Sequence, residues 1–408
     1  MPLLRNWRKK LVTKSDDKRV PALRFKGFTD EWEQRKLGEV AEIVGGGTPS
    51  TNISEYWNGN INWYSPTEIG SQTFVNSSKK KITELGLKES SAKLLPGKKT
   101  ILFTSRAGIG DMAIMNTDGS TNQGFQSWIV KPDITDIYFL YSLGGNLKKQ
   151  ALRKASGSTF LEISNSEVKK LSLYLPDFKE QTIIGKIIQL IDKIITLQQR
   201  KVKLINKLKN ALLTHFISKT SSQSASKTLK DITNIRGGYA FKSSEFTKSG
   251  FPVIKIANIS KNGEIEGPYS YVLSLKSDYQ LAKNDIVLAM SGATTGKIAR
   301  VNSNNIYLQN QRVGYFVNNH KIDYNYLYYL LISDQFKRQL ERILISGAQP
   351  NVSASDIEKF KFVILKSKKQ QSKISTLFKH IDYALKAGNN KIHTLIQIKQ
   401  FLLQNMFI

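Results

Sequence analysis

An internal repeat constrains the fold of this chain more than any other feature of its sequence. The segment Leu37–Gly46 reads LGEVAEIVGG and returns as Leu229–Gly238, LKDITNIRGG, with the same apolar spacing and the same final glycine pair. Further matches follow in unbroken order at shifts of about 190 residues: Leu95–Gly110 with Leu281–Gly296, Asn122-Gln123 with Asn310-Gln311, and Ser164–Val168 with Ser353–Ile357. A chain of 408 residues is too long for one ordinary core, so we expect two copies of one folded unit.

Each copy ends in a long helical pattern with apolar residues at the a and d positions of a heptad repeat. One such stripe ordinarily indicates an amphipathic helix packed on a globular core. Two matched stripes of about five heptads each favour a seam between the two helices instead. The predicted seam consists of Ile184, Ile188, Ile191, Ile195, Val202, Ile205, Leu212 and Phe216 on the first helix, and Ile374, Phe378, Ile381, Leu385, Ile392, Leu395, Leu402 and Met406 on the second.

The length of the linker decides the orientation of these helices. If residues 181–217 form one helix, that helix is about 55 Å long. The Ser/Thr/Lys-rich linker Ser218–Thr228 reaches only about 38 Å at full stretch, which is too short to return along the helix. We therefore predict an antiparallel coiled coil that relates the two copies by a pseudo-two-fold axis. Two-fold symmetry is typical of proteins that read two half-sites on duplex DNA.

The globular parts combine short strands and turns with one longer helical pattern each, so the predicted fold class is α+β. The expected domains are an N-terminal segment (1–29), a first globular domain (30–180), the central long helix (181–217), a linker (218–228), a second globular domain (229–370) and the C-terminal long helix (371–408).

Charge and composition narrow the function. With 61 Lys and Arg against 32 Asp and Glu, the net charge is +29, which indicates a polyanionic partner. Double-stranded DNA is favoured, and a membrane surface is the competing polyanion. Cysteine is absent, which excludes disulfides, thiolate zinc sites and a Cys nucleophile, and the four histidines are scattered. No stretch approaches 18 uninterrupted apolar residues, so we expect a soluble, cytoplasmic protein that does not enter a membrane.

The sequence contains no complete catalytic motif of the two types considered, a phosphate-binding loop and an adenine-methylating signature. The segment Ser291–Ile298 resembles a phosphate-binding loop, but only three residues separate Gly292 from Gly296, and Ile298 stands where a magnesium-binding hydroxyl is needed. A tight turn is the favoured interpretation. The adenine-methylating signature requires a Pro-Pro pair, and the chain has none. We therefore expect no catalytic residue and no metal or cofactor bound by this chain.

The remaining candidates are side chains suited to reading base edges from loops, namely Arg, Lys, Asn, Gln, Ser and Thr. In the first copy they are Thr48, Ser50, Arg106, Gln123, Gln126 and Ser158; in the second they are Lys242, Gln309, Gln311, Arg312, Gln349 and Asn351. For any one of them, solvated surface is the alternative. Gly45-Gly46-Gly47 and Gly237-Gly238 fit either a turn or a close approach to phosphate.

Several motifs together resemble the specificity subunit of type I restriction-modification systems. They are Gly46–Ser50, Glu55–Trp57, Ile61–Trp63, Leu95–Gly97, Ser105–Gly110, Thr121–Phe125 and Gly157–Phe160, and the resemblance extends from about Val20 onward. It implies two target recognition domains, each reading half of a bipartite DNA site, with the paired helices as a ruler for the spacer. One departure is that Glu180-Gln181 precedes the first helix, whereas the second has Lys369-Gln370.

The resemblance also implies partners. Two modification subunits would bring S-adenosylmethionine and methylate adenine N6, and restriction subunits would use ATP and magnesium to translocate and cleave DNA. The alternative is a stand-alone sequence-specific DNA-binding protein on the same scaffold; a nuclease or methyltransferase acting alone is disfavoured. Apolar residues outside the seam would serve a subunit that docks partners, or would widen the seam: Ile187, Ile194, Leu204, Leu208 and Leu213.

Overall fold

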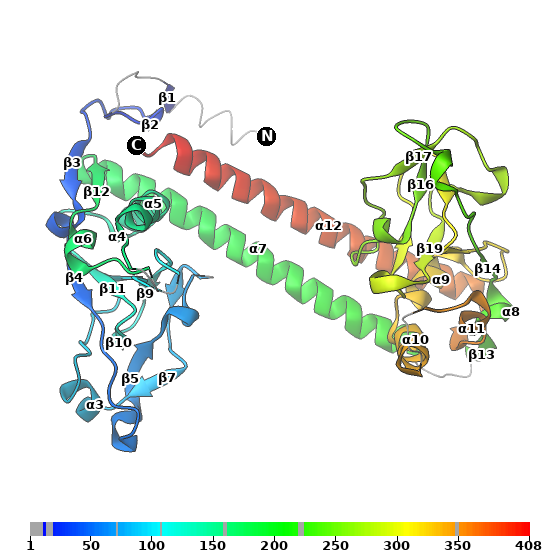
Figure 1. The fold of residues 1–408 in the computed structure, drawn as a ribbon, viewed down its shortest axis with the longest axis horizontal. Helices are drawn as coiled ribbons and strands as arrows, with labels where there is room; N and C mark the ends of the chain where they lie inside the picture. Colours follow the sequence, from blue (N-terminus) through cyan, green and yellow to red (C-terminus); the bar gives the residue numbers. More distant parts are fainter. Residues whose placement is uncertain are drawn as a thin grey trace. The chain divides into compact units, whose positions relative to one another are not determined.

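The computed structural model describes residues 11–13, 19–70, 72–106, 108–157, 161–218, 224–346 and 351–408. It forms two compact units, here called unit 1 (Met1–Gln198 with Lys391–Ile408) and unit 2 (Gln199–Asn390). Two long helices, α7 (Phe178–Ser218) and α12 (Lys368–Asn405), each contribute one part to unit 1 and one part to unit 2 (Figure 1).

The first copy of the repeat precedes α7. Its elements are β1 (Leu11–Thr13), β2 (Leu23–Phe25), β3 (Glu33–Lys36), α2 (Leu37–Val40), β4 (Ala41–Gly45), η1 (Ser54–Tyr56), β5 (Trp57–Tyr64), η2 (Pro66–Glu68), β6 (Phe74–Val75), β7 (Lys80–Ile82), α3 (Glu84–Lys88), β8 (Thr100–Phe103), β9 (Met112–Met115), β10 (Gly119–Thr121), β11 (Gln126–Val130), α4 (Ile137–Ser142), α5 (Gly144–Lys154), α6 (Asn165–Lys169) and β12 (Ser172–Leu175).

The second copy lies between α7 and α12. Its elements are β13 (Ser224–Thr228), α8 (Leu229–Ile232), β14 (Ile235–Arg236), η3 (Ser243–Glu245), β15 (Phe246–Thr247), β16 (Phe251–Ile254), η4 (Ile256–Asn258), β17 (Ser270–Val272), η5 (Ser277–Tyr279), β18 (Gln280–Leu281), β19 (Ile286–Ala289), η6 (Gly292–Thr294), β20 (Ile298–Arg300), β21 (Tyr307–Gln309), β22 (Val313–Phe316), α9 (Tyr324–Leu331), α10 (Asp334–Ser346), α11 (Ala354–Glu358) and β23 (Lys361–Leu365).

The two copies share a sheet topology, and the predicted α+β class with tandem domains is confirmed. The strand order β4-β11-β8-β9 in unit 1 recurs as β14-β22-β19-β20 in unit 2. A second sheet in each copy contains a parallel pair, β5 with β10 and β16 with β21. The central strands β8 (TILF) and β19 (IVLA) are buried at every position, as expected for short apolar runs covered on both faces.

The two long helices pair in an antiparallel direction, as predicted. In unit 1, Asp192 near the start of α7 meets Lys399 near the end of α12, and in unit 2, Lys209 near the end of α7 meets Asp382 nearer the start of α12. All of the predicted seam residues are buried or half-buried. Gly388, which interrupts the apolar pattern, lies so close to α7 that a Cβ there would stand 2.6 Å from Cγ2 of Val202.

The apolar stripe of each long helix also packs against the globular domains. Ile184 and Ile188 belong to the same buried cluster as Tyr138 and Phe139 of α4, so this part of α7 packs on the globular domain. The far ends also pack on cores, because Met406 belongs to the cluster of unit 1 and Leu213 to that of unit 2. Both interpretations of the stripe therefore apply, a helix on a core at both ends of each long helix and a seam between helices in the middle. On α12, the ring of Phe378 packs against that of Tyr329 on α9 in a tilted arrangement, with ring centroids 4.9 Å apart.

The junctions between domain and helix are built alike, which corrects the comparison of Glu180-Gln181 with Lys369-Gln370. In unit 1, Gln181 accepts a hydrogen bond from the backbone N–H of Asp136 (3.1 Å) and donates to the carbonyl of Pro176 (3.0 Å). In unit 2, Gln371 accepts from the N–H of Asp323 (2.8 Å) and donates to the carbonyl of Leu365 (2.7 Å). The counterpart of Gln181 is thus Gln371, one residue further along.

A buried ion pair ties the N-terminal segment to unit 1. Arg24 on β2 donates from Nε and Nη2 to the two carboxylate oxygens of Glu180 on α7, at 2.8 and 2.7 Å. The two side chains are 7% and 0% exposed, so neither charge retains much hydration. Because removal of one partner leaves a charge stranded in the interior, such a pair is far more costly to break than a surface pair.

We expect Arg24→Ala to lower the unfolding free energy of unit 1 by about 3–5 kcal/mol. All five tryptophans lie in the first 128 residues, so denaturant unfolding followed by tryptophan fluorescence reports on unit 1. The matched control is Arg19→Ala, which breaks the exposed Arg19–Glu31 pair and should cost less than about 1 kcal/mol. Equal small effects of both substitutions would contradict the structural role given to Arg24.

Candidate nucleic-acid interface

Three loops of the first copy meet at one end of the sheet β4-β11-β8-β9. They follow β4 (residues 46–50), join β8 to β9 (104–111) and join β10 to β11 (122–125). The N–H of Gly47 donates to the carbonyl of Thr121 (2.8 Å), and the N–H of Ser105 donates to the carbonyl of Gly124 (2.8 Å). A fourth segment joins them, because the N–H of Ile163 donates to the carbonyl of Ser105 (3.0 Å). The backbone therefore holds these loops as one group.

Two tryptophans of β5 fix the shape of the 46–50 loop. The indole of Trp63 donates to the carbonyl of Gly47 (2.9 Å), and the indole of Trp57 donates to the carbonyl of Ser50 (3.0 Å). The two rings pack edge to face with centroids 5.1 Å apart. Both tryptophans belong to the sequence motifs Glu55–Trp57 and Ile61–Trp63, but the motifs alone indicate no role for them.

The structure brings together most of the base-reading candidates of the first copy. Thr48 donates a hydrogen bond to the exposed side chain of Gln123 on the neighbouring loop. Arg106 stands on the 104–111 loop, 35% exposed, with Nη1 3.9 Å from a carboxylate oxygen of Glu162. Ser50 is exposed on the same loop as Thr48.

Two further candidates of the first copy differ from these. Gln126 is half-buried and accepts a hydrogen bond from Asn165 (2.8 Å), so its amide helps to hold α6 against the sheet. Ser158 lies outside the described residues.

The second copy repeats this group of loops with the same backbone bonds. The N–H of Tyr239 donates to the carbonyl of Gln309 (2.9 Å), that of Met290 to Arg312 (3.0 Å), and that of Val352 to Met290 (3.0 Å). By this correspondence Arg312 occupies the place of Gly124, whereas Arg106 belongs to the opposite loop of the same bonded pair. The two arginines therefore stand on different loops of the group.

Four candidates of the second copy lie on these loops and are exposed. Lys242, Gln311 and Arg312 are exposed, and Asn351 is exposed next to Val352. Gln349 lies outside the described residues.

The assignment of Gln309 as a base reader is wrong, because its side chain is fully buried. Its Nε2 donates to the carbonyls of Arg236 (2.8 Å) and Val313 (2.6 Å), and its Oε1 accepts from the Arg236 guanidinium. Arg236 in turn lies over the ring of Tyr315, 4.6 Å from its centroid. Burial raises the pKa of the Tyr315 hydroxyl and of the nearby Asp285 carboxyl. Gln309, Arg236 and Tyr315 thus form a partly buried polar cluster that packs under the loops of the second copy.

The glycine pairs have a packing role that neither of the two sequence interpretations named. A Cβ on Gly46 would stand 2.0 Å from the carbonyl oxygen of Asn122, and one on Gly238 would stand 2.0 Å from that of Asn310. Both positions therefore require glycine, because the backbone of the third loop approaches so closely.

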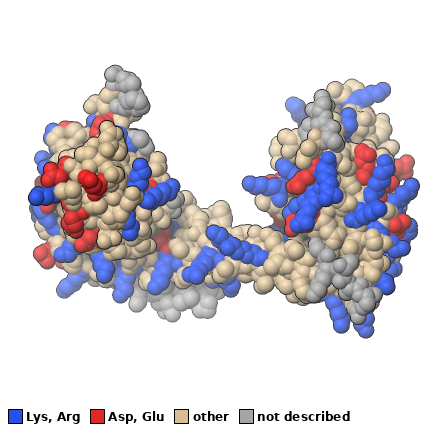
Figure 2. All heavy atoms as spheres, turned by 90° about the horizontal axis from the view of Figure 1, so that it is seen from below, with Lys and Arg blue, Asp and Glu red and all other residues tan. Residues whose placement is uncertain are grey.

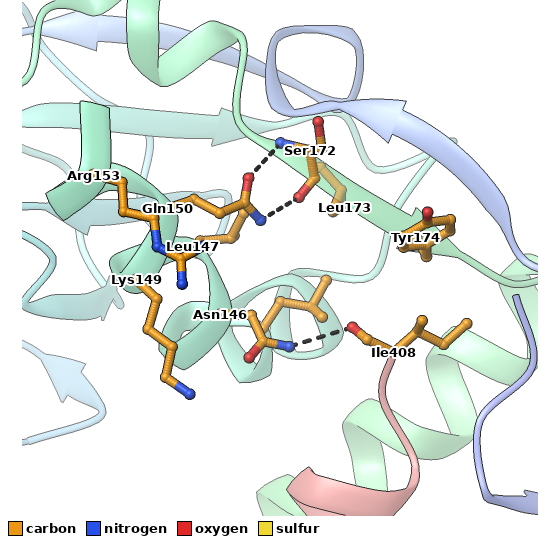
Figure 3. A pocket seen from close by; sticks show the side chains of 10 residues that line it. Asn146, Leu147, Lys149, Gln150, Arg153, Ser172, Leu173, Tyr174 and Ile408 are labelled. Carbon is orange, nitrogen blue, oxygen red and sulfur yellow. Dashed lines mark hydrogen bonds between the residues drawn. The ribbon is translucent and has the colours of Figure 1, made fainter. Parts of the chain in front are cut away.

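The part of the chain that the structure describes contains hollows but no cluster of metal ligands. No group of three or more His, Asp and Glu among them could hold a metal ion. A hollow of about 290 Å³ lies between α5, β12 and the C-terminal Ile408, and its charged lining residues are the cations Lys149 and Arg153 (Figure 3). The side chain of Asn146 closes one side by donating to the carbonyl of Ile408 (3.3 Å).

The net charge of +29 is distributed over the surface. Figure 2 shows Lys and Arg side chains spread over both units and along the long helices. None of the helices in the described part of the chain is long and apolar enough to span a membrane.

Comparison with known proteins identifies the family. Residues 29–209 and 222–397 each match the family described as type I restriction modification DNA specificity domain. The chain belongs to this family. The two matched ranges cover both copies of the repeat and most of both long helices, so the resemblance seen in the sequence motifs is confirmed.

Curated relatives and a solved structure agree. The type I restriction enzyme MjaIX specificity subunit of Methanocaldococcus jannaschii is 34% identical over 181 residues, which cover 44% of this chain and 42% of that protein. The MjaVIII specificity subunit of the same organism is 25% identical over 355 residues, covering 79% of this chain and 80% of that protein. The match to the first of these relatives thus spans less than half of its length.

The structural match concerns the fold alone. The crystal structure of the type I restriction-modification system S subunit from M. genitalium superposes with a TM-score of 0.66, at 18% identity, over 95% of this chain and 99% of that chain.

The burial of Gln309 generates a prediction for this specificity-domain protein. We expect Gln309→Ala to destabilise unit 2 by roughly 2 kcal/mol or more, because the Arg236 guanidinium and two buried carbonyls lose their partner. Gln311→Ala, two residues away and exposed, should change stability by less than about 0.5 kcal/mol. Hydrogen exchange of the β21 and β22 amides measures both effects, and an unprotected β21 in the Gln311 variant alone would contradict the assignment.

Proposed function

We propose that this chain is the DNA-specificity subunit of a type I restriction-modification complex. Each recognition domain reads one half of a bipartite site on double-stranded DNA, and the helix pair sets the spacer between the halves. The observation that carries the proposal is the repeated loop group. It presents half-buried Thr48 and Arg106 and exposed Gln123 in one copy, and exposed Gln311 and Arg312 in the other. Arg and Gln side chains on firmly held loops match the hydrogen-bonding edges of guanine and adenine.

The chain itself supplies placement rather than chemistry in this proposal. Adenine N6 methylation belongs to two modification subunits that carry S-adenosylmethionine, and DNA translocation and cleavage belong to restriction subunits that use ATP and magnesium. The names of the curated relatives, which are specificity subunits of restriction enzymes, support this division. A cytoplasmic location follows from the proposed target, cellular DNA.

An exposed apolar stripe on α7 supports docking of a partner subunit. Its members recur at spacings of three, four and seven residues, which places them on one face of the helix, and they are 39–56% exposed. They are Ile183, Leu190, Ile194, Leu197, Leu204 and Leu208. Two residues expected there behave differently: Leu213 is 7% exposed and belongs to the core of unit 2, and Ile187 is half-buried.

The proposal predicts that each recognition arginine controls one half of the site. Arg106→Ala should relax base preference in one half-site and Arg312→Ala in the other, by about 1–3 kcal/mol, or roughly 10- to 100-fold, if each forms a bidentate guanine contact. The measurement is genome-wide mapping of N6-methyladenine after co-expression with the modification subunit of the same system. Arg19→Ala is the control, because this arginine pairs with Glu31 away from the loops.

The outcomes separate the two candidate functions. A bipartite methylated motif, with each arginine variant degenerate in a different half, establishes the specificity role. A motif that weakens evenly at all positions in either variant indicates phosphate contacts in place of base contacts. Salt-dependent DNA binding without any methylated motif, despite a soluble complex, supports the stand-alone DNA-binding protein.

The docking stripe generates a separate prediction. Leu197→Lys with Leu204→Lys should weaken association with the modification subunit by at least about tenfold. Both side chains are more than half exposed, and neither belongs to a hydrophobic cluster of the described residues. Isothermal titration with the purified modification subunit measures the change. The control, Tyr383→Lys on α12, replaces a 77% exposed residue outside the stripe. Unchanged affinity in the double variant would place the docking surface elsewhere.

A further inference from the structure

Two aspartates stand out on helices that are otherwise basic. Asp382 is the sole acidic residue of α12, and α7 carries only Asp192 and Glu180, of which Glu180 is buried against Arg24. Asp192 and Asp382 occupy matched positions of the repeat, and so do Lys209 and Lys399, which interrupt the apolar pattern of the seam.

Each aspartate joins three structural elements at one point. In unit 1, Asp192 on α7 receives Nζ of Lys399 from α12 at 2.6 Å and the hydroxyl of Tyr138 from α4 at 2.7 Å. In unit 2, Asp382 on α12 receives Nζ of Lys209 from α7 at 2.6 Å and the hydroxyl of Tyr329 from α9 at 2.8 Å. Each carboxylate uses one oxygen for the lysine and the other for the tyrosine. We call these two arrangements the aspartate latches.

The two tyrosines that bond to the aspartates do not occupy matched positions of the repeat. The helices α4 and α9 begin at matched N-caps, Asp136 and Asp323, whose side chains accept the N–H groups of Phe139 and Tyr326. Counted from these caps, Tyr138 is the second residue and Tyr329 the sixth. The two copies therefore reach the same carboxylate geometry from different turns of the helix.

The latches lie where a change of register between the helices would be costly. The lysine side chains are 15% and 26% exposed, so a shifted pairing would leave two poorly hydrated cations without their carboxylates. The same number of residues separates Asp192 from Lys209 on α7 as separates Asp382 from Lys399 on α12, so both ion pairs are satisfied in one antiparallel register. Polar pairs within an apolar seam are the usual means of fixing register.

We propose that Asp192 and Asp382 are positioning residues that fix the register of the two helices and seat each recognition domain on them, and that they thereby set the spacer length of the bipartite site. This inference rests on the proposed function. A slip of one heptad moves one helix along the other by about 10 Å, which corresponds to about three base pairs of duplex DNA. Loss of the tyrosine contact alone loosens the seat of the domain and leaves the helix register intact.

The first test measures spacer preference with the full complex. Oligonucleotide duplexes carry both half-sites with the native spacer or with one base pair more or fewer, and the ratio of kcat/KM for native over altered spacers is compared. We expect Tyr138→Phe with Tyr329→Phe to lower this ratio at least about fivefold while the recognised bases stay the same. Asp192→Glu with Asp382→Glu should retain most of the preference. The control is Tyr383→Phe, an exposed tyrosine of α12 outside the latches.

The second test reads the register without DNA. The chain has no cysteine, so Val202→Cys with Gly388→Cys reports the native register, and Val202→Cys with Leu395→Cys reports a slip of one heptad. In the otherwise unchanged full chain the native pair should cross-link and the slipped pair should not. Adding Asp192→Asn and Asp382→Asn should transfer yield from the native pair to the slipped pair.

The results separate the latches from the proposed function. A parent complex without a bipartite motif refutes the proposed function, and the cross-linking test still decides the role of the aspartates in the register. An unchanged spacer ratio in the folded Tyr→Phe variant, or native cross-linking alone in the Asp→Asn variant, overturns the proposal. An equal loss of preference in the Tyr383→Phe control also overturns it, because the effect would then be general loosening. If the Asp→Asn chain does not fold, the Tyr→Phe variant, which keeps both ion pairs, carries the test.

Discussion

The antiparallel seam between α7 and α12 is the interaction on which the rest of the molecule depends. Each helix carries an apolar stripe too long for its own globular domain to cover: Ile184 and Ile188 pack on the first domain, but the stripe continues beyond it. Burial of the remainder requires a second helix with the same period, and the repeat supplies one. Since the two stripes run in opposite directions, each compact unit contains the start of one long helix and the end of the other.

The recognition domains are attached to this seam by a small set of repeated contacts. A glutamine at the start of each helix bonds to the N-cap region of a domain helix, and an aspartate further along receives a domain tyrosine and a lysine of the opposite helix. The loops that face the proposed DNA are held separately, by backbone hydrogen bonds and by two tryptophans in the first copy. Attachment to the helices and the proposed DNA recognition are therefore carried by different residues, which allows the loops to diverge between copies while the attachment stays the same.

Much of this architecture is predictable from the sequence because it rests on periodicity and length. The repeat, the heptad stripe and the short linker lead to paired antiparallel helices without knowledge of any tertiary contact. The direction in which a single side chain points is harder to predict in a short strand. Gln309 ends the three-residue strand β21, which pairs in parallel with β16, and the sequence pattern gives no sign of this pairing. The position of Leu213 is hard to predict for a similar reason. The heptad pattern allows a docking surface or a wider seam there, whereas the core of unit 2 covers this end of α7. The aspartate latches were missed because Tyr138 and Tyr329 occupy different positions of the repeat.

The most direct test of the central claim is the site recognised by a symmetrised chain. Replacement of the second globular domain by a second copy of the first, joined at the matched positions Gln181 and Gln371, would give a protein with one kind of recognition domain on both helices. If each domain reads one half-site and the helices run antiparallel, mapping of N6-methyladenine in cells with the modification subunit should reveal an inverted repeat of a single half-site. A direct repeat, or the unchanged asymmetric motif from a soluble complex, would contradict the account.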